Sequence, residues 1–289
     1  MVTSRLEIAV EESGSAAGVP VILLHGWPDS PRCWDRLLPT LHQAGFRTIT
    51  PYLRGNGPTR FRDDSIVRTG QASALAMDAM ELADAMGIDW FHLIGHDWGA
   101  RAAYICACVF PQRVQSCTAI SIGWGKVDPA QPPSIEQAQN FWYQWFMGLP
   151  QGESMLRNNR NEFTRHIWKI WNPGWEISNE EFSETATSFD NNDWPDVVLH
   201  YYRSRWGLAP LDPAYAEIEE KLASSELIDV PTLVLHGAAD PCVPASASEN
   251  KDQLFTNSYR RIVLDGVGHF PQRQAAKEVA AHIKSLICI

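Results

Sequence analysis

The sequence lacks a basic surface, a long apolar run and any regular spacing of cysteines. It has 34 aspartate and glutamate residues against 24 lysines and arginines, and the formal net charge of −10 argues against binding nucleic acid. No apolar run is long enough to span a membrane, and the first residues do not have the pattern of a secretory signal. The 6 cysteines show no C-x-x-C spacing. We therefore expect a cytoplasmic, metal-free protein that has no membrane or nucleic-acid partner.

Apolar residues are plentiful enough for a sizeable core. They make up 45% of the 289 residues, which suits one large α/β domain or a domain with an insertion. Short apolar runs without alternation are typical of strands buried on both faces of a parallel sheet, and we predict such strands at 19–24, 47–50, 91–94, 117–122, 231–235 and 261–264. Helical patterns lie between them, at 34–44, 71–86, 100–110 and 275–287. This alternation predicts a mostly parallel, doubly wound sheet covered on both faces.

One interval of the chain has a different character. Between Asp128 and Asp212 the sequence is rich in tryptophan, glutamine and asparagine, with helical stretches and no strand pattern. We predict that 1–128 and 212–289 form the α/β core and that 129–211 forms an inserted helical cap. An insertion of this kind is expected to cover an active site as a lid.

A tight turn after the third predicted strand carries the main chemical signal. Its sequence is Gly95-His96-Asp97-Trp98-Gly99, which is the G-x-S-x-G nucleophile elbow with aspartate in the serine position. The two glycines fit a sharp strand-to-helix turn whose central side chain projects from the end of the sheet. We predict that Asp97 is a nucleophile.

Partners for Asp97 follow in the order nucleophile, acid, histidine that this architecture requires. Asp240 comes just after one predicted strand and His269 just after the next, where parallel sheets place their sites. Asp128, after the fourth strand, is the rival candidate for the acid. Upstream, the segment His25-Gly26-Trp27-Pro28 follows the first strand, and we expect the backbone N–H groups of Trp27 and Trp98 to form an oxyanion hole.

With these motifs in place, the chain resembles α/β-hydrolase-fold proteins of the epoxide hydrolase and haloalkane dehalogenase branch. The resemblance implies that two cap segments supply ring-opening tyrosines, Tyr143 and Tyr202, with Tyr201 as the alternative to Tyr202. It also implies a small-molecule substrate, no cofactor, and a monomer or homodimer. We expect further pocket residues at His25, Trp142, Trp145, Tyr201 and Phe270.

An aspartate nucleophile favours attack on saturated carbon. A serine that attacked such a carbon would become a stable ether, whereas Asp97 would form an alkyl ester whose carbonyl belongs to the enzyme and is open to water. The sequence therefore predicts a hydrolase that opens an epoxide to a vicinal diol, with water activated by His269.

Two alternatives remain. A haloalkane or haloacetate dehalogenase would use the same triad, with Trp98 and Trp145 as halide donors. The chain resembles haloacetate dehalogenases at Arg101 but differs from them at Trp98 and Gln144. A non-catalytic small-molecule receptor is the second alternative, which the complete triad disfavours.

Overall fold

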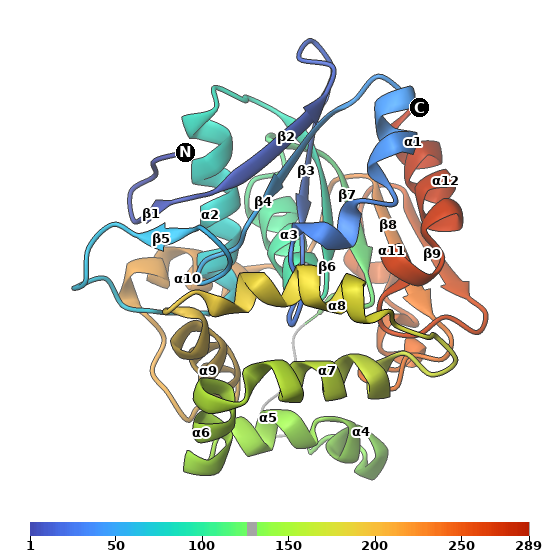
Figure 1. Ribbon diagram of the computed structural model, residues 1–289. Helices are drawn as coiled ribbons and strands as arrows, with labels where there is room; N and C mark the ends of the chain where they lie inside the picture. Colours follow the sequence, from blue (N-terminus) through green and yellow to red (C-terminus); the bar gives the residue numbers. More distant parts are fainter. Residues whose placement is uncertain (126–131, 289) are drawn as a thin grey trace.

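A twisted sheet forms the centre of the protein (Figure 1). The computed structural model describes residues 1–125 and 132–288, and within them seven strands pair in the order β2-β4-β3-β6-β7-β8-β9. All neighbouring pairs are parallel except β2 with β4. The strands are β2 (Val10–Gly14), β3 (Pro20–Leu24), β4 (Arg47–Pro51), β6 (Phe91–His96), β7 (Val114–Ile120), β8 (Thr232–Gly237) and β9 (Tyr259–Leu264). The predicted mostly parallel sheet is confirmed.

The edge strand β2 has no counterpart among the sequence predictions. Its sequence, Val-Glu-Glu-Ser-Gly, is largely polar, and its residues are half-buried or exposed. An antiparallel edge strand faces solvent, so it does not need the apolar run by which central strands are recognised. A separate two-stranded sheet joins β1 (Leu6–Glu7) and β5 (Arg60–Phe61).

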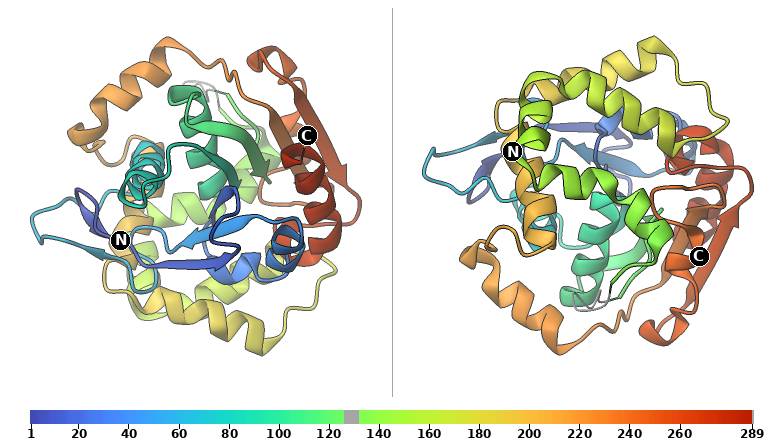
Figure 2. Two further views of the ribbon diagram at one scale, coloured as in Figure 1. Left: turned by 90° about the horizontal axis from the view of Figure 1, so that it is seen from above. Right: turned by 90° about the horizontal axis from the view of Figure 1, so that it is seen from below.

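Helices cover both faces of the sheet (Figure 2). On one face lie α2 (Ala72–Ala85), α3 (Trp98–Val109) and α10 (Ala216–Ser224), and on the other α1 (Leu38–Gln43) and α12 (Ala276–Ile287), with α11 (Pro271–Gln274) beside it. In β3, Ile22 and Leu24 belong to one apolar cluster, whereas Val21 and Leu23 belong to the other. Burial on both faces therefore explains why this strand is apolar without alternation.

The predicted helix at 34–44 is divided in the structure. A 3₁₀ turn, η1 (Pro31–Trp34), precedes the short α1, which has a proline at its start. Proline is tolerated in the first turn of a helix and disrupts the interior, so the helix begins anew near Pro39. The other predicted helices lie within two residues of the observed bounds.

Between β7 and β8 the described residues are helical and contain no sheet strand. The α-helices that precede α10 in this interval are α4 (Ile135–Asn140), α5 (Trp142–Met147), α6 (Pro150–Asn158), α7 (Arg160–Trp171), α8 (Asn179–Ala186) and α9 (Trp194–Arg205). They gather at the end of the sheet to which the parallel strands point (Figure 1). The cap boundaries themselves stay a prediction, because Asp128 and Pro129 lie outside the described residues.

The layer formed by helices α4 to α9 is joined to the core by buried polar contacts. The Trp168 indole N–H donates to the Pro28 carbonyl over 2.7 Å, and the His269 backbone N–H donates to the Trp171 carbonyl over 3.0 Å. Arg273 pairs with Asp29 at 2.5 Å and with Glu181 of α8 at 2.9 Å. The layer is therefore held directly over the loops that follow β3 and β9. Among the described residues, no helix has the length and apolar character needed to cross a membrane.

Candidate active site

The turn between β6 and α3 places Asp97 at the end of the sheet. Asp97 has φ 50° and ψ −111°, a conformation that costs a non-glycine residue on the order of 1–3 kcal/mol. Its glycine neighbours permit the turn: a Cβ on Gly95 would lie 2.1 Å from the Gly99 carbonyl oxygen, and one on Gly99 would lie 2.0 Å from that of Leu24. The sharp turn predicted from the sequence is thus present, with Asp97 at its apex.

The structure brings Asp97, His269 and Asp240 into one buried row. His269 Nδ1 lies 2.7 Å from Asp240 Oδ2, and its Nε2 lies 3.6 Å from Asp97 Oδ2. Asp240 Oδ1 accepts backbone N–H bonds from Cys242 (2.8 Å) and Val243 (3.1 Å). These bonds fix the Asp240 carboxylate, which in turn orients the imidazole towards Asp97. The rival acid, Asp128, lies outside the described residues.

The three side chains perturb one another's ionisation. Burial alone would lower the pKa of His269, but the charge of Asp240, the hydrogen bond to it and the nearby Asp97 carboxylate raise it to about 10. Burial would raise the pKa of Asp240, yet the charge and hydrogen bond of His269 and the nearby His236 lower it to about 2. The pKa of Asp97 is also lowered, since His269 and His96 outweigh its burial. The resting arrangement is therefore an imidazolium between two carboxylates.

The loop after β3 supplies a hydrogen-bond donor to Asp97. The Trp27 backbone N–H donates to Asp97 Oδ1 over 2.9 Å. This approach requires glycine at position 26, where a Cβ would lie 2.5 Å from the Asp97 Cβ. Trp98, the second expected oxyanion donor, is the first residue of α3. Its N–H belongs to the helix N-terminus, where backbone donors have no partner within the helix.

Tyr143 of α5 and Tyr202 of α9 line the same small cavity as Asp97. Their ring centroids lie 5.3 Å apart with an interplanar angle of 86°. The Tyr143 hydroxyl accepts a 2.8 Å hydrogen bond from Gln144 Nε2, and the Tyr202 hydroxyl accepts a 3.3 Å bond from the Trp98 indole. Burial raises the pKa of both phenols well above the usual value, so both remain protonated. Each can therefore donate a hydrogen bond into the cavity.

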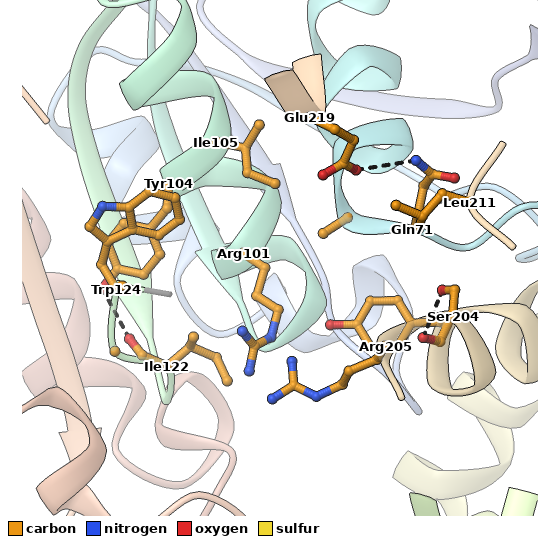
Figure 3. Close-up of a pocket in the computed structure, with 14 residues that line it drawn as sticks. Gln71, Arg101, Tyr104, Ile105, Ile122, Trp124, Ser204, Arg205, Leu211 and Glu219 are labelled. Atoms are coloured by element: carbon orange, nitrogen blue, oxygen red, sulfur yellow. Dashed lines mark hydrogen bonds between the residues drawn. The ribbon is translucent and has the colours of Figure 1, made fainter. Parts of the chain in front are cut away.

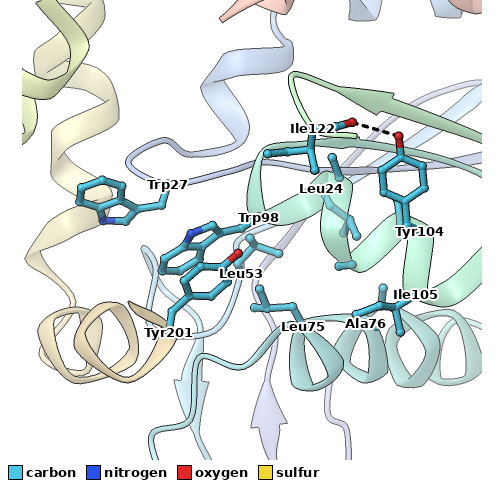
Figure 4. Close-up of a cluster of buried hydrophobic side chains, with 14 of the residues drawn as sticks. Leu24, Trp27, Leu53, Leu75, Ala76, Trp98, Tyr104, Ile105, Ile122 and Tyr201 are labelled. Atoms are coloured by element: carbon cyan, nitrogen blue, oxygen red, sulfur yellow. Dashed lines mark hydrogen bonds between the residues drawn. The ribbon is translucent and has the colours of Figure 1, made fainter. Parts of the chain in front are cut away.

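Tyr201, the alternative to Tyr202, has a different environment. Its ring stacks on Trp98 with centroids 4.0 Å apart and an interplanar angle of 16° (Figure 4). It also lines the cavity, as expected for a pocket residue. The cavity around Asp97 encloses about 10 Å³, room for about one water molecule. Its walls are formed by Asp97, Trp98, Arg101, Ile122, Phe141, Tyr143, Gln144, Tyr201, Tyr202, Arg205 and Val243.

Four other expected pocket residues lie away from these walls. Trp142 and Trp145 on α5 are 36% and 37% exposed, and the Trp145 indole N–H is bonded to the Ala138 carbonyl. Phe270 is fully buried against Trp168 and His269. His25 lies behind Trp27, and burial lowers its pKa to about 4, so it is neutral. An aromatic run on a helix identifies the segment but not the side that faces the site.

Sequence reasoning missed a basic side chain in the wall of this cavity. Arg205 lies one helical turn after Tyr202 on α9, and this i, i+3 spacing was the signal that could have found it. His96 fixes the loop that carries His269, because its Nε2 lies 2.8 Å from the His269 carbonyl oxygen. Within residues 1–125 and 132–288, no group of three or more His, Cys, Asp or Glu side chains is arranged to hold a metal ion.

Comparisons with known proteins agree on the fold. Residues 19–276 match the model of the alpha/beta hydrolase fold family. Epoxide hydrolase A of Mycobacterium tuberculosis is 26% identical over 96% of this chain and 93% of its own length, and human epoxide hydrolase 4 is 24% identical over 88% and 68%. The crystal structure of a candidate epoxide hydrolase from Klebsiella pneumoniae is 36% identical, with a TM-score of 0.94 over 100% of this chain and 96% of that one.

Proposed function

Because the chain belongs to the α/β-hydrolase fold family, we propose that it opens epoxides to vicinal diols through an alkyl ester on Asp97. The proposal rests above all on the two different contacts of the Asp97 carboxylate. Oδ1 accepts the Trp27 N–H, whereas Oδ2 faces His269. One oxygen is thus held where negative charge would later develop, and the other is left to attack carbon.

In the first step, Asp97 Oδ2 forms a bond to an epoxide carbon while the ring carbon–oxygen bond breaks. Tyr143 and Tyr202 hold the departing oxygen, and one of them supplies its proton. Their raised pKa values keep both phenols protonated until the ring oxygen develops charge. A phenol is a stronger acid than the alcohol that is formed, so proton transfer to this oxygen is favourable.

The second step depends on the change of charge at Asp97. Ester formation removes one of the two carboxylates that raise the pKa of His269 to about 10, so the pKa of His269 falls. His269 then gives its proton to the phenolate and restores the tyrosine hydroxyl. Neutral His269 then takes a proton from water, which attacks the Asp97 ester carbonyl. The Trp27 N–H stabilises the resulting oxyanion, and Asp240 stabilises the imidazolium. When the oxyanion collapses, the bond between the Asp97 carbonyl carbon and the alkoxy oxygen breaks. The departing alkoxide takes the proton of the Asp97 carboxylic acid, so the diol is released and the carboxylate is restored.

Dehalogenation receives less support from the side chains. The expected halide donors were the indole N–H groups of Trp98 and Trp145. The Trp145 N–H is bonded to the Ala138 carbonyl, and its ring packs on Trp206 with centroids 4.3 Å apart. Of the two expected halide donors only Trp98 lines the cavity, and its indole N–H is bonded to the Tyr202 hydroxyl, whereas two phenols line the cavity and can donate to an epoxide oxygen. The non-catalytic receptor is disfavoured as well, because simple binding has no need for the His269–Asp240 pair.

The test is the intact mass of His269→Gln after incubation with small epoxides such as styrene oxide. We expect an added mass of one substrate, because the ester forms and is not hydrolysed. His269→Gln combined with Asp97→Asn is the matched control and should stay unmodified. If the single variant gains no mass and the wild type forms no diol from any of the epoxides, the proposed function is wrong.

A further inference from the structure

Two arginines face each other beside the candidate active site. Arg101 lies one helical turn after Asp97 on α3, and Arg205 is the last residue of α9. Figure 3 shows their guanidinium groups pointing toward one another from the two helices. Both side chains line the small cavity that contains Asp97.

Among the described residues, no carboxylate forms an ion pair with either guanidinium. Arg205 Nε is buried and has no hydrogen-bond partner. Its guanidinium lies over the rings of Phe141 and Trp206, at 5.9 and 5.6 Å from their centroids. Burial together with repulsion from Arg101 lowers the pKa of Arg205 to about 10. Arg205 therefore remains cationic at neutral pH, and no carboxylate among the described residues balances its charge.

Arg101 and Arg205 are half-buried, whereas the two arginines that are buried in the described part of the chain are neutralised. Arg54 pairs with Asp78 at 2.6 Å, and Arg273 pairs with Asp29 at 2.5 Å. An unpaired cation in a partly desolvated place is costly, and proteins generally match it with an anion. The absence of a partner at Arg101 and Arg205 in the described part of the chain therefore points to an anion from outside the protein.

The position of the two arginines indicates which kind of molecule carries the anion. Arg101 and Arg205 line the cavity of about 10 Å³ at Asp97 and also two neighbouring pockets of about 210 Å³ each. The two arginines therefore lie at the boundary between the small cavity at Asp97 and the two larger pockets. An anion between them would be part of a molecule whose other end reaches Asp97, Tyr143 and Tyr202.

We propose that Arg101 and Arg205 bind an ionised carboxylate of the substrate, so that the enzyme selects small epoxides with a carboxylate close to the ring. This rests on the proposed function and specifies its substrate class. A guanidinium group is opposite in charge to a carboxylate and matches its planar hydrogen-bond geometry. The bound carboxylate satisfies Arg205 Nε and directs the epoxide ring towards Asp97 and the two phenols.

The test compares the kcat/KM for glycidate with that for glycidamide, its neutral analogue of the same size. We expect the wild type to favour glycidate at least tenfold, and Arg101→Gln and Arg205→Gln each to lower this preference at least tenfold. Arg165→Gln is the matched control: this arginine also lies over an aromatic ring, Phe182, but is on α7 outside the three cavities. It should leave the preference unchanged.

A binding measurement separates this inference from the proposed function. Cyclopropanecarboxylate has the shape of glycidate but no ring oxygen, so calorimetry reports binding without chemistry. We expect it to bind the wild type at least tenfold more tightly than either arginine variant, and more tightly than cyclopropanecarboxamide.

If neither epoxide is hydrolysed but cyclopropanecarboxylate binds as expected, the anion site stands and the proposed function is wrong. If glycidamide is hydrolysed as well as glycidate and neither variant changes the ratio, the epoxide hydrolase proposal stands and the carboxylate site is overturned. Equal unfolding temperatures of the wild type and the two variants exclude misfolding as the cause of lost binding.

Discussion

His269 and Asp240 are joined by a 2.7 Å hydrogen bond between Nδ1 and Oδ2, and neither side chain is exposed. Such a bond links the stability of the protein to pH. The pKa of His269 is raised to about 10, so its contribution is complete below the unfolded value near 6.5 and is lost as pH rises through 10. The pKa of Asp240 is lowered to about 2, so its contribution is complete above roughly pH 4 and is lost as pH falls through 2.

The first prediction concerns Asp240→Asn. We expect the free energy of unfolding to fall by about 3 kcal/mol near pH 5–6, because the buried imidazolium loses its partner. The difference from the wild type should shrink as pH rises from about 6.5 through 10, because His269 becomes neutral in both proteins above its raised pKa. Urea denaturation at several pH values measures it. A difference that stays constant from pH 5 to 10 would contradict the raised pKa of His269.

The second prediction concerns the two phenols. Tyr143→Phe and Tyr202→Phe should each slow ester formation on Asp97 by roughly 10²-fold, since one proton donor to the ring oxygen is lost. The double variant should form no detectable ester. Single-turnover mass measurements in the His269→Gln background isolate this step. Tyr52→Phe is the control, because the Tyr52 hydroxyl is bonded to Glu11 and Tyr52 does not line the cavity. Normal ring opening in the double variant would remove the tyrosines from the mechanism.

The third prediction concerns Gln144, which holds Tyr143 in place. Its Nε2 donates to the Tyr143 hydroxyl over 2.8 Å, and its Oε1 accepts the Trp206 indole N–H over 2.9 Å. We expect Gln144→Leu to lower kcat about tenfold with little change in KM, because the phenol loses its orientation. In a Tyr143→Phe background the same substitution should have almost no further effect. Additive losses in the double variant would show that Gln144 acts elsewhere.

The fourth prediction concerns the tight turn at Asp97. Gly99→Ala should lower the free energy of unfolding by more than about 3 kcal/mol, because its Cβ would lie 2.0 Å from the backbone carbonyl of Leu24. Gly87→Ala is the control: its position has a positive φ of 66° but open space, so only the backbone strain of about 1 kcal/mol is expected. Equal losses in the two variants would mean that the turn is not limited by this contact.

The sequence determined much of the fold by local means. A strand buried on both faces must be apolar along its length, so six of the sheet strands could be predicted from short windows. The turn around Asp97 could be predicted in the same way, because a nucleophile elbow needs two glycines and a strand-to-helix transition within a few residues. The loops after β8 and β9 could be predicted to carry partners of Asp97, since parallel strands bring their carboxyl ends to one edge of the sheet.

Only the tertiary structure decided which side chains of the cap face the site. The aromatic run on α5 pointed equally to Tyr143, Trp142 and Trp145, yet Tyr143 is buried and the two tryptophans are more than a third exposed. Arg101 and Arg205 are far apart in the chain and meet because α3 and α9 bring them together (Figure 3). The i, i+3 spacing of Tyr202 and Arg205 suggests a shared helix face, but which way that face turns and which distant helix it meets depend on packing across the whole molecule.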